Sequence, residues 1–264
     1  MTARPSTSPN RIGVVVPARD EQELLPACLA ALERAAGRTR IPVTVVVVLD
    51  ACSDASAEVV AAARLPRLQR VVMIGSDRGN VGYARDLGVR ALLADYGAAG
   101  LWLANTDADS TVPPLWFRRQ LNHAERGAAA VAGTVVVTDW SGHSTRTRRH
   151  YLRRYTAGHG HRHTHGANLS MSATAYLATG GFAHLAADED VAMIGQLIAA
   201  GQPIAWAADL PVSTSARLAG RTPAGFAGHL RLITQPPSAG PSPVPAGHQN
   251  RAADSDTPAR EGAL

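Results

Sequence analysis

The stretch Leu101-Trp-Leu-Ala-Asn-Thr-Asp-Ala-Asp-Ser110 joins a short apolar run to two carboxylates, Asp107 and Asp109. The apolar part predicts a buried strand, and open α/β sheets bind their ligands where strands end. In extended backbone, side chains two residues apart leave the same face, so both carboxylates would converge. One or two carboxylates, completed by phosphate oxygens, are typical ligands of Mg²⁺ or Mn²⁺. The stretch therefore predicts a metal site at the end of a central strand.

The same residues have a structural alternative. Asp107-Ala-Asp-Ser110 also fits a polar turn whose aspartates cap a helix beginning near Pro113 and Pro114. Because short acidic motifs often occur without a bound ion, the stretch alone leaves both interpretations open.

The chain before this stretch alternates between strand and helix patterns. Apolar β-branched runs predict strands, and apolar residues at helical spacing predict helices. Strands are expected at 12–16, 43–49 and 70–74, and helices at 23–36, around 59–63 and at 81–96. Gly37 is expected to end the first helix. Such alternation predicts an α/β protein with a mostly parallel central sheet covered by helices on both faces.

The chain after Ser110 is less regular. We expect helices at 114–126, 173–179 and 189–200, strands at 128–137 and 168–172, and a basic helix or loop at 146–157. Two short strands should follow near Ile204 and Val212. Residues 1–10 and 235–264 are expected to be disordered, because proline, glycine, serine and scattered charges leave little to bury.

Composition limits the class of protein. The 264 residues, 45% of them hydrophobic, favour one main domain with a sizeable core. The sequence lacks an apolar run of about 20 residues and a signal-peptide pattern, so we expect a cytoplasmic protein, with peripheral attachment to the inner membrane face left open. Cys28 and Cys52, the only cysteines, are expected to be reduced thiols.

The charge pattern favours no specific nucleic-acid function. The net charge is +5, and every one of the 26 basic Lys/Arg side chains is an arginine. Arginine binds phosphate in a bidentate way, and a basic surface attracts nucleic acid non-specifically. No zinc finger, helix-turn-helix or aromatic RNA-binding motif is present, so specific nucleic-acid binding is not expected.

The first two predicted strands also end in polar residues. Pro17-Ala-Arg-Asp-Glu21 follows the first strand, and Asp50 ends the second. Parallel strands place these ends at the same sheet edge as Asp107, where Asp50 could accept hydrogen bonds from a base or ribose. Asp20 and Asp54 are better explained as acids favoured at helix starts. A dinucleotide-binding Rossmann domain is disfavoured, because the first turn lacks Gly-x-Gly-x-x-Gly.

Taken together, these motifs resemble the family 2 glycosyltransferases, nucleotide-sugar-dependent enzymes with a GT-A type fold. The resemblance covers roughly 12–221 and rests on the order and spacing of several motifs. They are Pro17-Ala-Arg-Asp-Glu21, Val48-Leu-Asp-Ala-Cys-Ser-Asp54, Gly79-Asn-Val-Gly-Tyr-Ala-Arg85, Asp107-Ala-Asp109, Gly166-Ala-Asn-Leu-Ser-Met171, Gly180-Gly-Phe182 and Glu189-Asp190. The implied catalytic domain spans 11–234, with a nucleotide-sugar half at 11–110 and an acceptor half at 111–234.

The resemblance implies a role for each matched residue. Metal binding falls to Asp107 and Asp109, catalysis to Asp190 as general base with its neighbour Glu189, and acceptor-side contacts to Gly166 and Asn168. Nucleotide-sugar contacts are implied for Pro17, Ala18, Arg19, Glu21, Asp50, Arg85 and Asp107. Arg217 is a further candidate, because it follows the last predicted strand in a loop that could close over the diphosphate. The implied donor is a UDP- or GDP-sugar and the implied acceptor an unspecified hydroxyl.

The sequence departs from the family pattern in three ways. Leu49 stands where a second acid usually precedes Asp50, Gly79-Asn80 reverses a common order, and Asp86 replaces a frequent asparagine. These differences affect the identity of the donor more than the class of reaction. A sugar-phosphate nucleotidyltransferase or a non-catalytic nucleotide-sugar-binding protein are the alternatives.

Two further segments each have two possible interpretations. His159, His161, His163 and His165 alternate, so an extended chain would present four imidazoles on one side, as a metal site or as a loop contacting an acceptor. Arg221, beyond Arg217, fits either the closing loop or an ordinary surface position.

Overall fold

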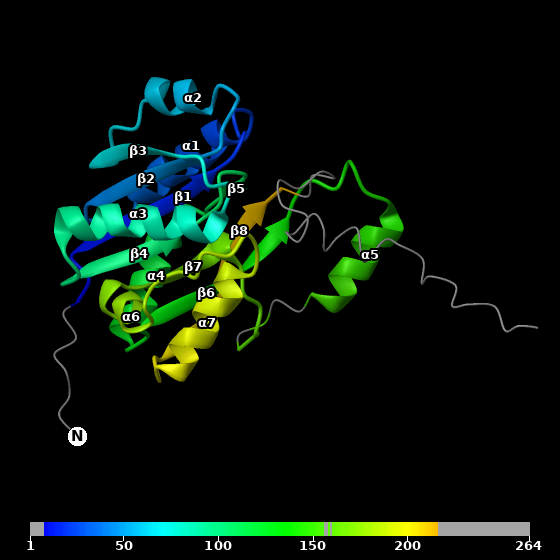
Figure 1. Cartoon of the computed structure of the whole chain (residues 1–264). Helices are drawn as coiled ribbons and strands as arrows, with labels where there is room; N and C mark the ends of the chain where they lie inside the picture. The colour runs from blue at the N-terminus through cyan, green and yellow to red at the C-terminus, as the bar shows by residue number, and fades with distance from the viewer. Residues whose placement is uncertain (1–7, 156–157, 159, 216–264) are drawn as a thin grey trace, which may run out of the picture. The chain divides into compact units, whose positions relative to one another are not determined.

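The computed structural model describes residues 8–155, 158 and 160–215. Within this part of the chain, eight strands form one sheet in the order β3-β2-β1-β4-β7-β6-β8-β5 (Figure 1). The strands are β1 (Arg11–Ala18), β2 (Val43–Asp50), β3 (Arg70–Ser76), β4 (Leu101–Asn105), β5 (Ser110–Thr111), β6 (Ala130–Val137), β7 (Leu169–Ser172) and β8 (Ile204–Thr214). The helices are α1 (Leu25–Ala36), α2 (Ser56–Ala62), α3 (Val81–Tyr96), α4 (Trp116–Glu125), α5 (Thr145–Arg154), α6 (Ala173–Ala178) and α7 (Glu189–Ala199).

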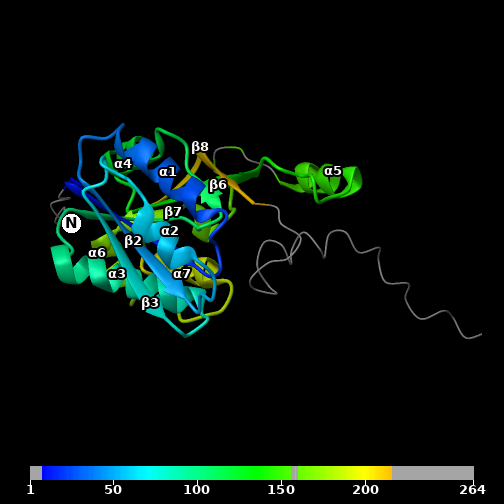
Figure 2. The same cartoon turned by 90° about the horizontal axis from the view of Figure 1, so that it is seen from above.

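Helices cover both faces of the sheet, as the sequence predicts. One core joins the sheet to α1, α2 and α4, and a second joins the opposite face to α3, α6 and α7 (Figure 2). Strands buried on both faces need continuous apolar runs, and β2 is buried at every position. Gly37 follows the last turn of α1, where it was expected.

Strand direction is mixed on one side of the sheet. β1 pairs in parallel with β2 and β4, and β2 with β3, which confirms the parallel half. β7 runs antiparallel to both β4 and β6, and β5 runs antiparallel to β8. A local apolar pattern cannot show which way a strand will run, so the sequence missed these reversals.

The prediction of two short strands near Ile204 and Val212 is wrong, because residues 204–214 form one continuous strand, β8. Asp209 and Pro211 interrupt the apolar pattern of this strand. The strand passes them at an irregularity in its pairing with β6, where the register moves from Gly133 opposite Ala207 to Val135 opposite Val212. A bulge lets a strand carry residues that cannot join the ladder.

Residues 216–264 lie outside the described part of the chain. The predicted disordered ends and domain boundaries therefore stay predictions. Both cysteines are free thiols, as expected. Among the described helices, none has the length and apolar character that crossing a bilayer requires.

Candidate active site at the carboxyl ends of the strands

The strand ends that carry the predicted site residues meet at one sheet edge. Ala18 of β1 pairs with Leu49 of β2, and Val15 pairs with Asn105 of β4. The loops that follow these strands therefore begin side by side. This confirms the expectation that polar residues after β1, β2 and β4 share one edge of the sheet.

Asp107 and Asp109 lie in a tight turn between β4 and β5, not in extended backbone as we expected. The Ser110 amide donates to the Asp107 carbonyl at 3.1 Å and closes the turn. Ala108 points into the core, 2% exposed, while both aspartates are half-buried. The helix-cap alternative is wrong, because α4 begins later, with Leu115 at the cap position and no side-chain cap.

Arg85 connects the turn to the start of α7. Its Nη2 donates to Asp107 Oδ1 at 2.6 Å, and its Nε donates to Glu189 Oε1 at 2.9 Å. Although burial alone would lower the pKa of Arg85, the attraction of these two carboxylates outweighs it and raises the pKa. A buried charged arginine thus brings α3, the β4 end and α7 together.

Asp190 lies beside this bridge and is held by backbone amides. Its Oδ2 accepts from the Gly166 amide at 2.6 Å and its Oδ1 from Val191 at 2.8 Å. Burial raises the pKa of Asp190. The positive charge of Arg85 and the hydrogen bonds from the Val191 and Gly166 amides oppose this effect only in part. Burial likewise raises the pKa of Glu189. A carboxylate with a raised pKa is suited to accept a proton.

Gly166 fits its position because a side chain would not. A Cβ there would collide with the Arg85 Nη2 atom. The residue therefore brings its amide close to Asp190 while leaving room for the guanidinium.

Asp50 is committed to the loop between β3 and α3. The carboxylate is 4% exposed and accepts from Ser76 Oγ at 2.7 Å, the Gly79 amide at 3.0 Å and the Asn80 amide at 2.6 Å. Asn80 in turn caps α3 by accepting from the Tyr83 amide. In this arrangement Asp50 shapes the loop, whereas the sequence suggested a direct contact with a base or ribose.

The loops after β1 and β2 interlock, which changes the interpretation of Asp20. Asp20 adopts a left-handed backbone (φ 52°) and accepts from both the amide and the hydroxyl of Ser53. The hydrogen bond from the Ser53 backbone amide is the main reason that the pKa of Asp20 is lowered. Asp54 accepts from the Gln22 amide and from Ser56 at the start of α2. Asp20 therefore joins two loops, and only Asp54 also serves a helix start.

The remaining residues of the opening loop differ in exposure. Pro17 is half-buried and Ala18 buried, while Glu21 is 5% exposed and its amide donates to Ser56 Oγ. Arg19 is exposed and lies against Gly79, with Nη1 3.5 Å from where a glycine-replacing Cβ would stand. Arg19 is thus the exposed residue of Pro17-Ala-Arg-Asp-Glu21.

Asn168 requires a correction, because it lies too deep to touch an acceptor. It is 2% exposed, and its Oδ1 accepts from the Trp116 indole at 2.9 Å. Its Nδ2 donates to the carbonyls of Thr134 and Leu210 at 2.7 and 2.8 Å. Asn168 ties the segment after Gly166 to the sheet.

Three histidines of the run, His161, His163 and His165, stack their rings in sequence. His161 Nδ1 accepts from the His163 amide and its Nε2 contacts the Ala207 carbonyl, so both ring nitrogens already have protein partners. His165 Nε2 contacts the Tyr155 hydroxyl at 3.0 Å. Ring nitrogens that already make hydrogen bonds within the protein are less available as metal ligands, which disfavours a metal site formed by these histidines. His159, Arg217 and Arg221 lie outside the described residues.

Sequence reasoning missed one acidic group. Asp20, Cys52 and Asp54 place their ligand atoms within 4.8 Å of one another, the one such group found among the described residues. The hydrogen bonds between the two loops already explain this proximity, and only the spatial meeting of the loops after β1 and β2 could have revealed it.

Comparison with known proteins agrees with this architecture, a GT-A type α/β fold with acidic residues at its strand ends. A model of the family described as glycosyl transferase family 2 matches residues 13–180, and the chain belongs to that family. The succinoglycan biosynthesis protein ExoO of Rhizobium meliloti (strain 1021) is 37% identical over 102 residues, covering 39% of this chain and 27% of ExoO.

Two solved structures share the fold. S. aureus TarS (residues 1–349) in complex with UDP-GlcNAc has a TM-score of 0.60 at 14% identity, covering 84% of this chain and 65% of that one. The Pyrobaculum calidifontis mannosyltransferase PcManGT, with GDP-Man and Mn²⁺, has a TM-score of 0.58 at 19% identity, covering 83% and 61%. The chain thus spans less than two thirds of each of these relatives.

Proposed function

We propose that this protein is an inverting glycosyltransferase that moves a sugar from a nucleotide-diphosphate sugar to an acceptor hydroxyl. The observation that carries the proposal is the Arg85 bridge, which joins the Asp107 turn to the Glu189-Asp190 pair. It brings residues suited to hold a diphosphate next to a carboxylate suited to take a proton. Family membership and the nucleotide sugars bound by TarS and PcManGT support the same reaction class.

Asp107 and Asp109 fit a hard divalent cation. Both carboxylates are half-buried in one tight turn at the sheet edge. Mg²⁺ or Mn²⁺ needs only one or two carboxylates besides phosphate oxygens. When bound, the ion would neutralise charge that develops on the leaving nucleoside diphosphate. The Mn²⁺ in the PcManGT complex supports this assignment.

Asp190 is the proposed general base. Two amides orient its carboxylate at the start of α7, and its raised pKa favours proton uptake. The acceptor hydroxyl loses its proton to Asp190 as its oxygen attacks the anomeric carbon from the face opposite the diphosphate. A single displacement of this kind inverts the anomeric centre. Glu189, bound to Arg85, holds the bridge beside it.

The loops after β1, β2 and β3 are proposed to bind the nucleotide. Arg19 would contact the diphosphate or sugar directly, while Pro17, Ala18, Glu21 and Asp50 give the loops their shape. We retain Arg217 as a candidate for closing over the diphosphate. UDP- and GDP-sugars are the proposed donors.

The direct test replaces the base without changing its size. We expect Asp190→Asn to lower kcat by about 10² or more, the scale of losing a general base, while nucleotide binding persists. Release of nucleoside diphosphate from UDP- and GDP-sugars measures the rate, and calorimetry measures binding.

Asp188→Asn is the matched control for this test. Asp188 lies two residues earlier, is exposed, and has a left-handed backbone (φ 61°) that asparagine tolerates. Its kcat should stay within about twofold of wild type, since Asp188 has no proposed part in proton transfer. Near-normal turnover by Asp190→Asn would remove Asp190 from the proposed role.

A further inference from the structure

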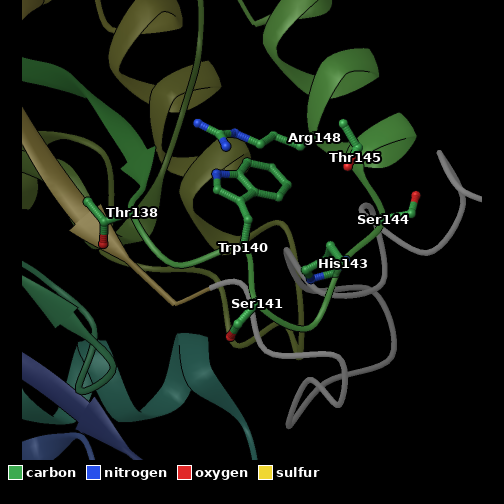
Figure 3. Close-up of a pocket in the computed structure, with 7 residues that line it drawn as sticks. All are labelled: Thr138, Trp140, Ser141, His143, Ser144, Thr145 and Arg148. Atoms are coloured by element: carbon green, nitrogen blue, oxygen red, sulfur yellow. The ribbon is translucent and has the colours of Figure 1, made fainter.

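A pocket of about 360 Å³ opens where the chain leaves β6 and before it enters α5 (Figure 3). Its walls include Thr138, Trp140, Ser141, Ser144 and Arg148. This volume lies within the usual range of about 300–1,000 Å³ for ligand sites. None of its lining residues belongs to the strand-end site described above, so the pocket needs its own explanation.

Trp140 is held in place by the protein. Its Nε1 donates to the Val137 carbonyl at 3.0 Å, and its ring packs on Tyr151 with centroids 5.4 Å apart. His143 meets the indole edge-on at 5.7 Å. The indole therefore keeps one orientation yet is only half-buried. A fixed aromatic ring with an accessible face can bind without losing side-chain entropy.

The chemistry around the indole suits a sugar ring. A pyranose has apolar C–H faces that pack on an aromatic ring, and hydroxyls that exchange hydrogen bonds with polar groups at its rim. Thr138 and Ser141 add hydroxyl groups to the pocket lining, and Figure 3 shows Arg148 extending from α5 alongside the indole ring.

The charge at this pocket favours an anionic ligand. None of the residues lining the pocket is acidic, and the neighbouring Asp139 carboxylate accepts from the Ser141 amide at 2.9 Å. α5 carries no acid at all, and its arginines Arg146, Arg148, Arg149 and Arg153 are exposed. Arg148 forms no ion pair with any described residue. A guanidinium binds carboxylate, sulfate or phosphate groups in a bidentate way.

Two routes connect this pocket to the proposed catalytic edge. Val137, at the end of β6, pairs with Thr214 of β8, whose hydroxyl accepts from Ser110 at 3.0 Å, next to Asp109.

The second route is aromatic. Tyr151 stacks on Tyr155 at 5.2 Å, and the Tyr155 hydroxyl contacts His165 at 3.0 Å. The next residue, Gly166, donates to Asp190. The wall behind Trp140 thus continues to the segment that orients the proposed base.

We propose that the Trp140 pocket is a subsite for the acceptor, and that this acceptor is a saccharide carrying an anionic group. The inference rests on the proposed function and adds the class of acceptor to it. Trp140 packs on a sugar ring distant from the reacting hydroxyl, and Arg148 pairs with the acidic substituent.

Direct binding without donor tests this inference. Calorimetry is run with tetragalacturonate and hyaluronan tetrasaccharide as acidic probes, galactotetraose as the neutral probe, and inorganic sulfate as the anion alone. We expect an acidic tetrasaccharide to bind at least about tenfold more tightly than galactotetraose or sulfate. The inference would be overturned if neither acidic tetrasaccharide binds at concentrations up to about 10 mM, or if sulfate binds as tightly as the acidic tetrasaccharides do.

Variants assign the binding to the pocket. Arg148→Ala should weaken the binding of the acidic probes at least about tenfold. Arg153 is an exposed arginine of the same helix outside the pocket lining, so Arg153→Ala should change their binding less than about twofold. Trp140→Phe keeps an aromatic ring packed on Tyr151 but should weaken the binding of every tetrasaccharide. Equal losses in the Arg148 and Arg153 variants would mean a diffuse charge effect and would overturn the site.

Donor binding is measured separately on the same proteins. UDP, GDP and their sugars, with Mn²⁺, should bind the Arg148 and Trp140 variants as they bind wild type. Saccharide binding without nucleotide binding would defeat the proposed function alone, and nucleotide binding without saccharide binding would defeat this inference alone.

Discussion

Arg85 shows what a residue can do that its sequence motif does not reveal. The resemblance placed it among nucleotide-sugar contacts, whereas the structure buries it to 2% exposure between Asp107 and Glu189. Its Nη1 is buried and has no hydrogen-bond partner among the described residues. The sequence identified Arg85 and both carboxylates but could not show that they pair, because they come from α3, the β4 turn and α7.

Removing the guanidinium should destabilise the fold. Arg85→Met leaves the buried Glu189 carboxylate without its cation, and breaking a buried pair costs about 3–5 kcal/mol. Urea denaturation measures the loss. The control is Arg70→Met, where an exposed arginine pairs with the exposed Asp95 of α3 and the loss should stay below about 1 kcal/mol. Equal losses in the two variants would contradict the central place of Arg85.

The raised pKa of Asp190 predicts the direction of the pH dependence. Activity requires the ionised base, so kcat/KM should fall as pH drops through a pKa above the ordinary aspartate value of 3.8. A pH–rate profile measures this limb, and Asp188→Asn should leave it unchanged. A limb at or below the ordinary value would argue against a buried base.

The same shift has the opposite sign for stability. A carboxyl group whose folded pKa is raised stabilises the fold fully below its unfolded pKa, and that contribution is lost as pH rises through the folded pKa. Asp190→Asn should therefore melt at a higher temperature relative to wild type at pH 8 than at pH 4, as measured by calorimetry. A difference in melting temperature that is independent of pH would exclude this linkage.

Elements with strong local patterns could be predicted, and long-range pairing could not. The helix expected at 81–96 has those bounds as α3, and β1 and β2 extend the predicted runs by only a few residues. The direction of β7 and the continuity of β8 depend on which distant strands pair, which no local pattern contains. Likewise, the turn at Asp107 follows from β5 pairing with β8.

The loop before α7 is fastened to the start of α3. The Gly82 amide donates to the Leu185 carbonyl at 3.0 Å, and Asn80 Nδ2 donates to the His184 carbonyl at 3.0 Å. The His184 ring contacts Asp86 at 2.8 Å. Because this loop leads directly into Glu189 and Asp190, its position sets where the proposed base lies.

Gly82→Ala should disturb this contact. Its Cβ would collide with the Ala183 carbonyl, and the clash with backbone should cost about 1–3 kcal/mol and reduce transfer. Gly195→Ala in α7 is the control, since its Cβ meets nothing and alanine should stabilise the helix by about 1 kcal/mol. Thermal unfolding of both variants measures the contrast, and a gain in stability for Gly82→Ala would show that the loop is not fixed there.

At the scale of the whole molecule, one sheet edge is proposed to carry both halves of the reaction. The parallel strands β1, β2 and β4 supply the loops for the nucleotide, and β7, β6 and β8 extend the same sheet toward the Trp140 pocket. The sequence predicted the shared edge from parallel pairing alone. The pocket was beyond prediction, because it depends on how α5 packs its Tyr151 against Trp140.

The most direct measurement is a crystal structure with Mn²⁺ and UDP or GDP, using the anomalous signal of manganese to locate the ion. We predict a manganese peak between the Asp107-Asp109 turn and the diphosphate, with Asp190 facing the position of the transferred sugar. A nucleotide bound away from this turn, or a manganese peak without contact to either aspartate, would contradict the proposal that these acids form one catalytic site.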